Sequence, residues 1–229
     1  MSNHLLYPAI QTKRAYLISG MLLCMLVVGI LLPMVSEAHP HSWIDMKTYI
    51  EGDQQKITGF KMDWRFDPMT TAYLFDGEDM SKAHRQATLN KLANSIIHNM
   101  LSTHYFTYFY NGKIPIRYQN ARHPVLTEAH GKARLTFDIP LAKPYELTPH
   151  PLKLLIFDPT YYVDMSWKKR QDIILSTALQ SACSFKMIEP HPTPAQVSHA
   201  MSIPADADPD DTLGQLFTQS VVLTCHAVH

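Results

Sequence analysis

The residues best suited to chemistry are two histidines, His39 and His41, that follow a long apolar segment near the amino terminus. Ser36 and Ala38 occupy the small-residue positions that signal peptidase reads, which predicts cleavage after Ala38. His39 would then be the first residue and would offer a transition metal both its imidazole and its free α-amine. With His41 two residues later, the new terminus would carry a concentrated set of nitrogen ligands.

Export depends on how the segment 1–38 is processed. Lys13 and Arg14 supply the positive flank of a signal peptide. The apolar run 15–35 is longer than the roughly 7–15 residues of an ordinary signal core and is long enough to span a bilayer. An uncleaved membrane anchor is therefore the alternative. Pro33 and the small-residue box after it favour a cleaved signal and a periplasmic protein.

Composition excludes several classes of function for the mature chain, which we expect to form a single domain over 39–229. Without Lys13, Arg14 and Glu37 it has 18 basic and 19 acidic residues, a balance that predicts no nucleic-acid partner and no anionic membrane surface. Eight glycines in the whole chain, with no glycine-rich phosphate loop, argue against a nucleotide site. The absence of a nucleophile elbow and of an H-E-x-x-H motif favours a protein that is not an enzyme.

Hydrophobic periodicity predicts the elements that must position the histidines. Apolar residues alternate with period two over most of the mature chain, which is typical of half-buried strands. A helical period runs from Ser81 to about Thr103 and predicts one long amphipathic helix. Glu189 to Asp211 reads as a surface excursion, and Asp211 could cap a short helix through Phe217. The expected fold is α+β, a mainly antiparallel sheet or sandwich with that helix and a disulfide-closed C-terminal segment. Strands are expected near 44–50, 60–66, 105–110, 114–118, 133–139, 153–157, 161–167, 183–187 and 221–225.

Cys183 and Cys225 remain as an even pair once Cys24 leaves with the signal. Each lies in an alternating apolar segment with its sulfur on the apolar face. In an oxidising compartment this pattern predicts a structural disulfide rather than two buried free thiols. Closing a loop of about 43 residues would stabilise the fold by roughly 4 kcal/mol in the chain-entropy model.

The predicted register of the first two strands brings carboxylates toward the histidines. A three-residue turn at 52–54 pairs position i with about 106 minus i. Trp43 would then lie opposite Asp63, and His39 opposite Asp67, on the face turned away from the core. Asp67 is the favoured carboxylate and Asp63 the second choice. The predicted metal ligands are His39, His41, Asp67 and Asp63.

Three observations narrow the kinds of metal site that these residues could form. Pro40 has no amide N–H to lose, which excludes the square-planar amino-terminal copper mode but leaves a tetrahedral or brace-like site open. The alternative to metal binding, which the pattern favours less, is a frayed terminus whose histidines contact only water. Asp158, in an Asp-Pro-Thr turn, is expected to be a structural turn residue rather than a ligand.

Four motifs in fixed order carry a family resemblance over essentially the whole mature chain. They are His-Pro-His-Ser-Trp-Ile-Asp at 39–45, Trp-Arg-Phe-Asp at 64–67, Asp-Pro-Thr-Tyr-Tyr at 158–162 and Leu-Gly-Gln-Leu-Phe at 213–217. With these motifs the chain resembles the bacterial domain of unknown function 1007 family, exported proteins described as periplasmic components of a transport system. The resemblance implies an inner-membrane permease of the nickel/cobalt type as partner, with zinc uptake implicated for some members.

The resulting hypothesis is a periplasmic accessory protein that captures or delivers a divalent cation for a membrane permease. Zn²⁺ is the expected metal, with Ni²⁺, Co²⁺ and Cu²⁺ as alternatives. The rival hypothesis is a copper protein with an N-terminal histidine site, either a carrier or an oxidative enzyme. A third is a structural partner of the permease that binds no metal.

Overall fold

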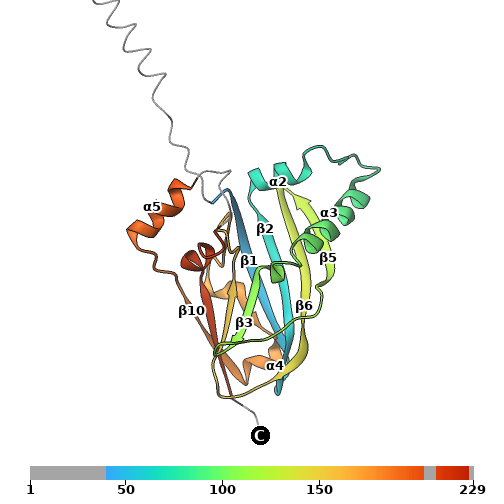
Figure 1. The fold of residues 1–229 in the computed structure, drawn as a ribbon. Helices are drawn as coiled ribbons and strands as arrows, with labels where there is room; N and C mark the ends of the chain where they lie inside the picture. The colour runs from blue at the N-terminus through green and yellow to red at the C-terminus, as the bar shows by residue number, and fades with distance from the viewer. Residues whose placement is uncertain (1–39, 204–209, 227–229) are drawn as a thin grey trace, which may run out of the picture. The chain divides into compact units, whose positions relative to one another are not determined.

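Two β-sheets share one hydrophobic core in the computed structural model, which describes residues 40–203 and 210–226 (Figure 1). The six-stranded sheet has the order β5 (Arg122–Ala129), β6 (Lys132–Glu146), β2 (Lys56–Phe66), β1 (Ser42–Gly52) and β8 (Val163–Ser166), with β9 (Ile173–Leu175) also paired to β1. The five-stranded sheet has the order β10 (Cys183–Ile188), β11 (Ser220–Cys225), β7 (Leu152–Ile156), β3 (Thr107–Asn111) and β4 (Ile114–Pro115). Neighbouring strands are antiparallel except where β1 pairs with β8 and β9.

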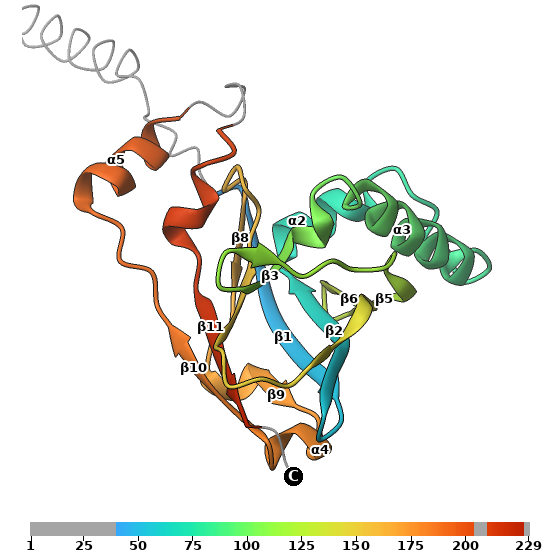
Figure 2. The same ribbon diagram turned by 60° about the horizontal axis from the view of Figure 1, so that its bottom comes forward.

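The helices lie outside the sheets, and α3, with 15 residues, is the longest of those described. The α-helices are α2 (Pro68–Phe75), α3 (Arg85–Asn99), α4 (Thr177–Gln180) and α5 (Pro194–Ser202), and the 3₁₀ turns are η1 (His104–Phe106), η2 (Arg170–Asp172) and η3 (Gly214–Phe217). Figures 1 and 2 show α2 and α3 beside β5 and β6, and α5 on the side of β10 and β11. Within the described ranges, no helix combines the length and the apolar character needed to cross a membrane.

The chain is mainly β-sheet with few helices, as the periodicity predicts, but the details differ. The helix expected over 81–103 is α3, which begins at Arg85 and ends at Asn99. The expected surface excursion contains α5, and the expected closing helix is the 3₁₀ turn η3. Strands β5 and β9 and helices α2 and α4 were not predicted. The segment 1–38 and His39 lie outside the described residues, so cleavage of the signal stays a prediction.

The buried faces of β1 and β2 are those that the alternation of apolar and polar residues predicts. On β1 and β2 the even-numbered apolar residues are buried, while most of their odd-numbered neighbours face away from the core. The predicted disulfide is present: Cys183 and Cys225 lie directly opposite each other on β10 and β11 and are bonded. The bond joins the two strands at the edge of the five-stranded sheet.

The predicted register of the first hairpin is wrong by four positions. The loop is Asp53–Gln55 rather than 52–54, and the Asp53 carboxylate accepts the backbone N–H groups of Gln55 (2.9 Å) and Lys56 (3.0 Å). An irregularity between Glu51 and Gly52 shifts the pairing further. Ile44 therefore lies opposite Phe66, so that partner numbers sum to 110 instead of 106. The shift conserves the inward and outward faces, because it is an even number of residues.

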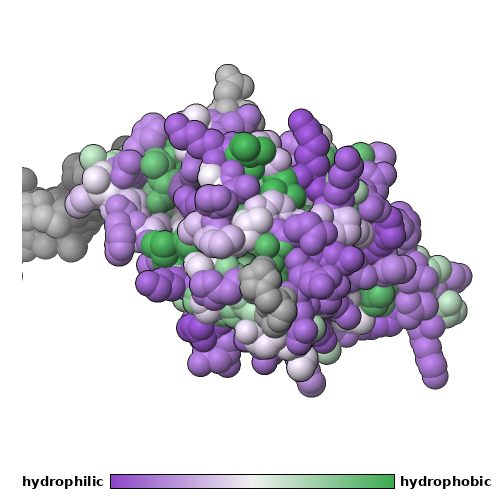
Figure 3. All heavy atoms as spheres, turned by 90° about the horizontal axis from the view of Figure 1, so that it is seen from below, coloured by the Kyte–Doolittle hydropathy of each residue, from purple (hydrophilic) through white to green (hydrophobic). Residues whose placement is uncertain are grey.

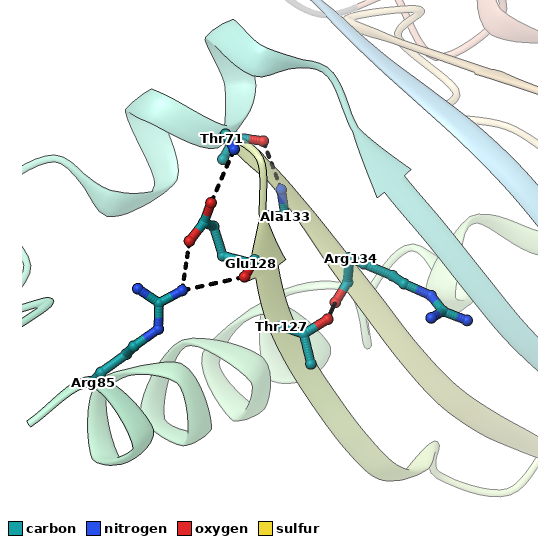
Figure 4. Close-up of polar contacts among 7 residues, drawn as sticks. Thr71, Arg85, Thr127, Glu128, Ala133 and Arg134 are labelled. Carbon is teal, nitrogen blue, oxygen red and sulfur yellow. Dashed lines mark hydrogen bonds and ion pairs between the residues drawn. The ribbon is translucent and has the colours of Figure 1, made fainter. Parts of the chain in front are cut away.

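A set of polar contacts fixes α2 and α3 against the β5–β6 hairpin (Figure 4). The Thr71 hydroxyl of α2 donates to the Asp67 carbonyl (2.7 Å) and accepts the N–H of Ala133 in β6 (2.9 Å). The Arg85 guanidinium of α3 pairs with the Glu128 carboxylate of β5 at 2.5 Å. That bond is the main reason why the pKa of Glu128 lies below its usual value. These contacts hold the start of α2 at the end of β2, next to the Trp-Arg-Phe-Asp motif at 64–67.

Candidate functional site

Asp67 joins the second strand to α2 and to the start of β1. Its Oδ1 accepts the N–H groups of Met69 (2.8 Å) and Thr70 (3.0 Å), which makes Asp67 the N-cap of α2. Its Oδ2 accepts the N–H of Trp43 (3.0 Å) and the Thr70 hydroxyl. The Asp67 N–H in turn donates to the Trp43 carbonyl at 3.0 Å. The carboxylate predicted to lie opposite His39 is therefore beside Trp43 and holds two elements together.

These contacts stabilise the ionised form of Asp67. Partial burial is the largest single influence and would raise its pKa, but the hydrogen bonds from the Thr70 hydroxyl and from the N–H groups of Trp43, Thr70 and Met69 together lower it. Asp67 is thus an anion that already accepts four hydrogen bonds. A metal ion at this carboxylate would have to displace them.

Asp63 lies away from the histidine end of the sheet. The true register places it opposite Lys47 rather than Trp43. Its two oxygens accept the Arg134 guanidinium from β6, at 2.6 Å from Nε and 2.7 Å from Nη2. The Asp63 carboxylate is buried beneath the half-exposed Arg134 side chain. The structure therefore gives Asp63 a buried bidentate ion pair and does not bring it to His41.

His41 is held at the edge where β1 begins. Its N–H donates to the carbonyl of Tyr162 at 2.9 Å, which starts the parallel pairing of β1 with β8. The His41 and Tyr162 rings pack with their centres 4.7 Å apart and a 33° tilt. The hydroxyl of the next residue, Ser42, is hydrogen-bonded to the Thr70 hydroxyl at 2.8 Å. The same Thr70 hydroxyl contacts Asp67, so one side chain links the neighbour of His41 to the cap of α2.

The loop that packs on His41 is fixed by Asp158. Its carboxylate accepts the Thr160 N–H (3.0 Å), the Thr160 hydroxyl and the Val163 N–H (3.1 Å). Gly214 of η3 approaches so closely that an added Cβ would lie 1.9 Å from the Asp158 carbonyl oxygen. Asp158 is the structural turn residue that its motif predicts.

The loop and η3 also meet through aromatic packing. The Tyr161 and Phe217 rings stack with centres 4.2 Å apart and a 12° tilt, and the Gly214 N–H donates to the Pro159 carbonyl at 2.7 Å. The third and fourth motifs of the sequence therefore form one unit. Since His41 packs on Tyr162 and Trp43 is bonded to Asp67, all four motifs meet at one end of the molecule.

That end also exposes large apolar side chains. Trp43 is 41% exposed, and Tyr162 is 48% exposed. Met69 and Tyr73 of α2 and Leu216 of η3 are exposed as well. The opposite end, seen in Figure 3, is covered mainly by hydrophilic residues with hydrophobic residues in small separate groups. The motif end thus differs from the opposite end in both its sequence motifs and its exposed aromatic side chains.

A complete metal site is not formed by the part of the chain that the structure describes. Within residues 40–203 and 210–226, no three His, Cys, Asp or Glu side chains are grouped so as to hold a metal ion. Two pairs that the sequence analysis did not single out are His84 with Asp79 (2.8 Å) and His123 with Asp138 (2.9 Å). Both pairs are solvent-exposed. The partners are five positions apart in the first pair and 15 positions apart in the second.

Comparison with known proteins agrees with the motif resemblance. The family model described as "Protein of unknown function (DUF1007)" matches residues 24–225. An uncharacterized protein of Haemophilus influenzae (strain ATCC 51907 / DSM 11121 / KW20 / Rd) is 32% identical over 205 residues, which cover 87% of this chain and 97% of the relative. The chain belongs to the DUF1007 family of proteins of unknown function.

Proposed function

We propose that the protein is a periplasmic metal-binding accessory protein, which captures or delivers a divalent cation for an inner-membrane permease. Zinc is the metal we assign, with nickel and cobalt as alternatives that the same nitrogen ligands would accept. His41 supplies one imidazole, and His39 supplies a second imidazole together with the amino terminus that signal cleavage would create. Asp67 and Asp63 take structural roles in this proposal, since their oxygens are already hydrogen-bonded.

The observation that carries the proposal is the position of His41 at the meeting point of the four motifs. Its backbone is bonded to Tyr162, and its ring packs on the Tyr162 ring. A ligand whose backbone and ring are both restrained loses less conformational freedom when a metal binds, which favours affinity. Asp67 restrains the strand from the other side by bonding Trp43.

Proton competition sets the expected pH dependence. Imidazole binds a metal only in its neutral form, and histidine in model peptides has a pKa of about 6.5. A free α-amine has a pKa of about 7.7–8.0 and must also lose its proton. Zinc affinity should therefore fall steeply from pH 8 to pH 6, more steeply than for a site made of a single imidazole.

The test uses untagged protein exported through its own signal. Intact-mass analysis establishes the amino terminus and counts the bound metal, and zinc titration then gives the affinity. We expect a mass that begins at His39, one bound zinc, and at least a tenfold loss of affinity in His41→Ala. His98→Ala, on the exposed face of α3, is the matched control and should bind zinc like the parent.

Two results would contradict the proposal. One is a mass that begins at Met1 or after His39, and the other is a His41→Ala protein that binds zinc as tightly as His98→Ala. The copper alternative is separated by function, because Cu²⁺ outcompetes Zn²⁺ at nitrogen sites whatever the biological metal. Zinc-dependent binding to the permease supports a carrier, whereas turnover of an oxidisable substrate by the copper-loaded protein supports an enzyme.

A further inference from the structure

The outer face of the six-stranded sheet, which is turned away from the core, carries a half-buried carboxylate at the motif end. Asp164 of β8 is the direct neighbour of Trp43 in β1, and the next pair along these two parallel strands is Met165 with Ile44. Met165 and Ile44 are both buried in the core. Because side chains alternate along a strand, Asp164 and Trp43 lie on the outer face.

His41 is a diagonal neighbour of Asp164 on this face. His41 precedes Trp43 by two residues, and its N–H donates to the carbonyl of Tyr162, which precedes Asp164 by two residues. By the same alternation His41 and Tyr162 lie on the outer face, where their rings pack on each other. Diagonal neighbours on adjacent strands have Cα atoms about 7–8 Å apart. An imidazole and a carboxylate at that separation can reach one metal ion, because each metal bond adds about 2 Å to the reach of the side chain.

The Asp164 carboxylate differs from those of Asp67 and Asp63 in having its oxygens available to a ligand. Asp67 accepts four hydrogen bonds, and Asp63 forms the bidentate ion pair with Arg134. Within residues 40–203 and 210–226, the Asp164 carboxylate accepts no hydrogen bond and forms no ion pair. Its oxygens are not among the buried side-chain atoms that lack a partner in these ranges, so a metal ion can reach them from solvent.

The charges around Asp164 leave room for a cation. The Lys168 ammonium is bonded to the neighbouring carboxylate of Asp45 at 3.0 Å. Burial raises the pKa of Asp164, Lys168 lowers it and Asp45 raises it, with a net shift upward. The surrounding groups therefore offset only part of the cost of holding a charged carboxylate here, and a bound cation would offset the rest.

We infer that Asp164 is the carboxylate ligand of the metal site, so that the ion is held by three nitrogens of His39 and His41 and by one Asp164 oxygen. This inference rests on the proposed metal function. Three nitrogens and one oxygen match the four-coordinate geometry of zinc. The ligand set contains no sulfur, so it favours Zn²⁺, Ni²⁺ and Co²⁺ over Cu⁺. The ion would join the start of β1 to β8.

The test is zinc titration of untagged, exported protein whose mass begins at His39. Asp164→Asn conserves the size of the side chain and removes its charge, and we expect its zinc affinity to fall about tenfold or more. Asp138→Asn is the matched control, because Asp138 is also half-buried on the outer face but lies on β6, away from His41. The control should bind zinc like the parent.

Thermal melting without zinc checks that both variants fold. Asp164→Asn should melt at the parent's temperature or above it, because burial disfavours the charge that the substitution removes.

Salt separates a direct ligand from a charge that acts at a distance. Screening shortens the range of electrostatic interactions from about 10 Å at 0.1 M salt to about 3 Å at 1 M. The ratio of zinc affinities between the parent and Asp164→Asn should therefore remain about tenfold in 0.1 M and in 1 M sodium nitrate. A ratio that falls below about twofold at 1 M would show that Asp164 does not touch the metal and would overturn the inference.

His41→Ala and His98→Ala, titrated alongside, separate failure of this inference from failure of the proposed function. Weak zinc binding by His41→Ala, with Asp164→Asn binding as tightly as Asp138→Asn, would overturn the role of Asp164 and leave the histidine site in place. Equal binding by His41→Ala and His98→Ala would contradict the metal function itself. Weaker binding by Asp138→Asn than by Asp164→Asn would place the metal at the His123–Asp138 pair and would overturn both.

Discussion

The Asp67 and Asp158 carboxylates at the motif end around His41 are hydrogen-bonded, whereas the buried Tyr118 hydroxyl has no partner among the described residues. At the motif end the Asp67 and Asp158 carboxylates each accept several hydrogen bonds and hold strands, a loop and a helix in place. The Tyr118 hydroxyl, by contrast, is buried and has no hydrogen-bond partner among residues 40–203 and 210–226. The difference shows that the acidic residues most visible in the sequence motifs build the scaffold. We propose His41, at the edge of that scaffold, as a residue that binds a ligand.

The largest effect should come from removing the Asp67 carboxylate. Asp67→Ala deletes the N-cap of α2 and leaves the Trp43 N–H without its acceptor, so we expect a loss of about 3 kcal/mol in the free energy of unfolding. Asp67→Asn retains an oxygen for the cap and should lose about 1 kcal/mol. Urea denaturation measures both. Equal stability of Asp67→Ala and the parent would show that the motif end does not depend on this residue.

Gly214 tests whether the third and fourth motifs form one unit. In Gly214→Ala the new methyl group would overlap the Asp158 carbonyl, and we expect a loss of about 2 kcal/mol. Gly77→Ala is the control: its backbone is also unfavourable for alanine, with φ of 72°, but the added methyl meets nothing within 4 Å. The control should lose about 1 kcal/mol. A smaller loss for Gly214→Ala than for Gly77→Ala would mean that the loop and η3 move apart freely.

Tyr118→Phe should raise the free energy of unfolding, whereas Asp67→Ala and Gly214→Ala at the motif end should lower it. Removing an unpaired buried hydroxyl abolishes its desolvation cost, so the variant should gain up to about 1 kcal/mol of stability. Thermal denaturation measures the gain. Destabilisation by Tyr118→Phe would reveal a hydrogen bond at this hydroxyl and would remove the contrast between the two regions.

The smallest effect is the pH dependence of the motif end. The pKa of Asp67 is lower in the folded protein than its ordinary value of about 3.9. The ionised carboxylate therefore stabilises the folded state above that pH, and this stabilisation is lost as the pH falls toward the pKa of the folded state. The stability difference between the parent and Asp67→Asn should therefore shrink between about pH 5 and pH 3. A difference that is constant over this range would contradict an ionised, hydrogen-bonded Asp67.

Local patterns in the sequence predicted much of this fold. Alternating residues on β1 and β2 identified their buried faces, and the apolar settings of Cys183 and Cys225 identified the disulfide. The prediction of the register of the first hairpin was wrong, because the register depends on where the turn begins and on the irregularity at Glu51 and Gly52. Hydrophobic periodicity reveals neither.

The sites were harder to predict, because they depend on contacts distant in sequence. Asp63 pairs with Arg134, 71 residues away, so its role could not be read from its neighbours. Asp67 did carry a local signal: an Asp before Pro at the start of a short helix is typical of an N-cap. Asp164 was not singled out, because its neighbour Trp43 comes from a distant part of the sequence and only the parallel pairing of β1 with β8 brings the two together.

The most direct test of the account is an NMR titration with Co²⁺, whose paramagnetism broadens the signals of residues close to the bound metal. The protein should be uniformly labelled, exported and shown by mass to begin at His39. We expect the amide signals of His41, Ser42 and Tyr162 to broaden first, while those of Tyr105 and Tyr118 stay sharp. Earlier broadening at the exposed pairs His84–Asp79 or His123–Asp138, with His41 unaffected, would contradict a metal site at the motif end.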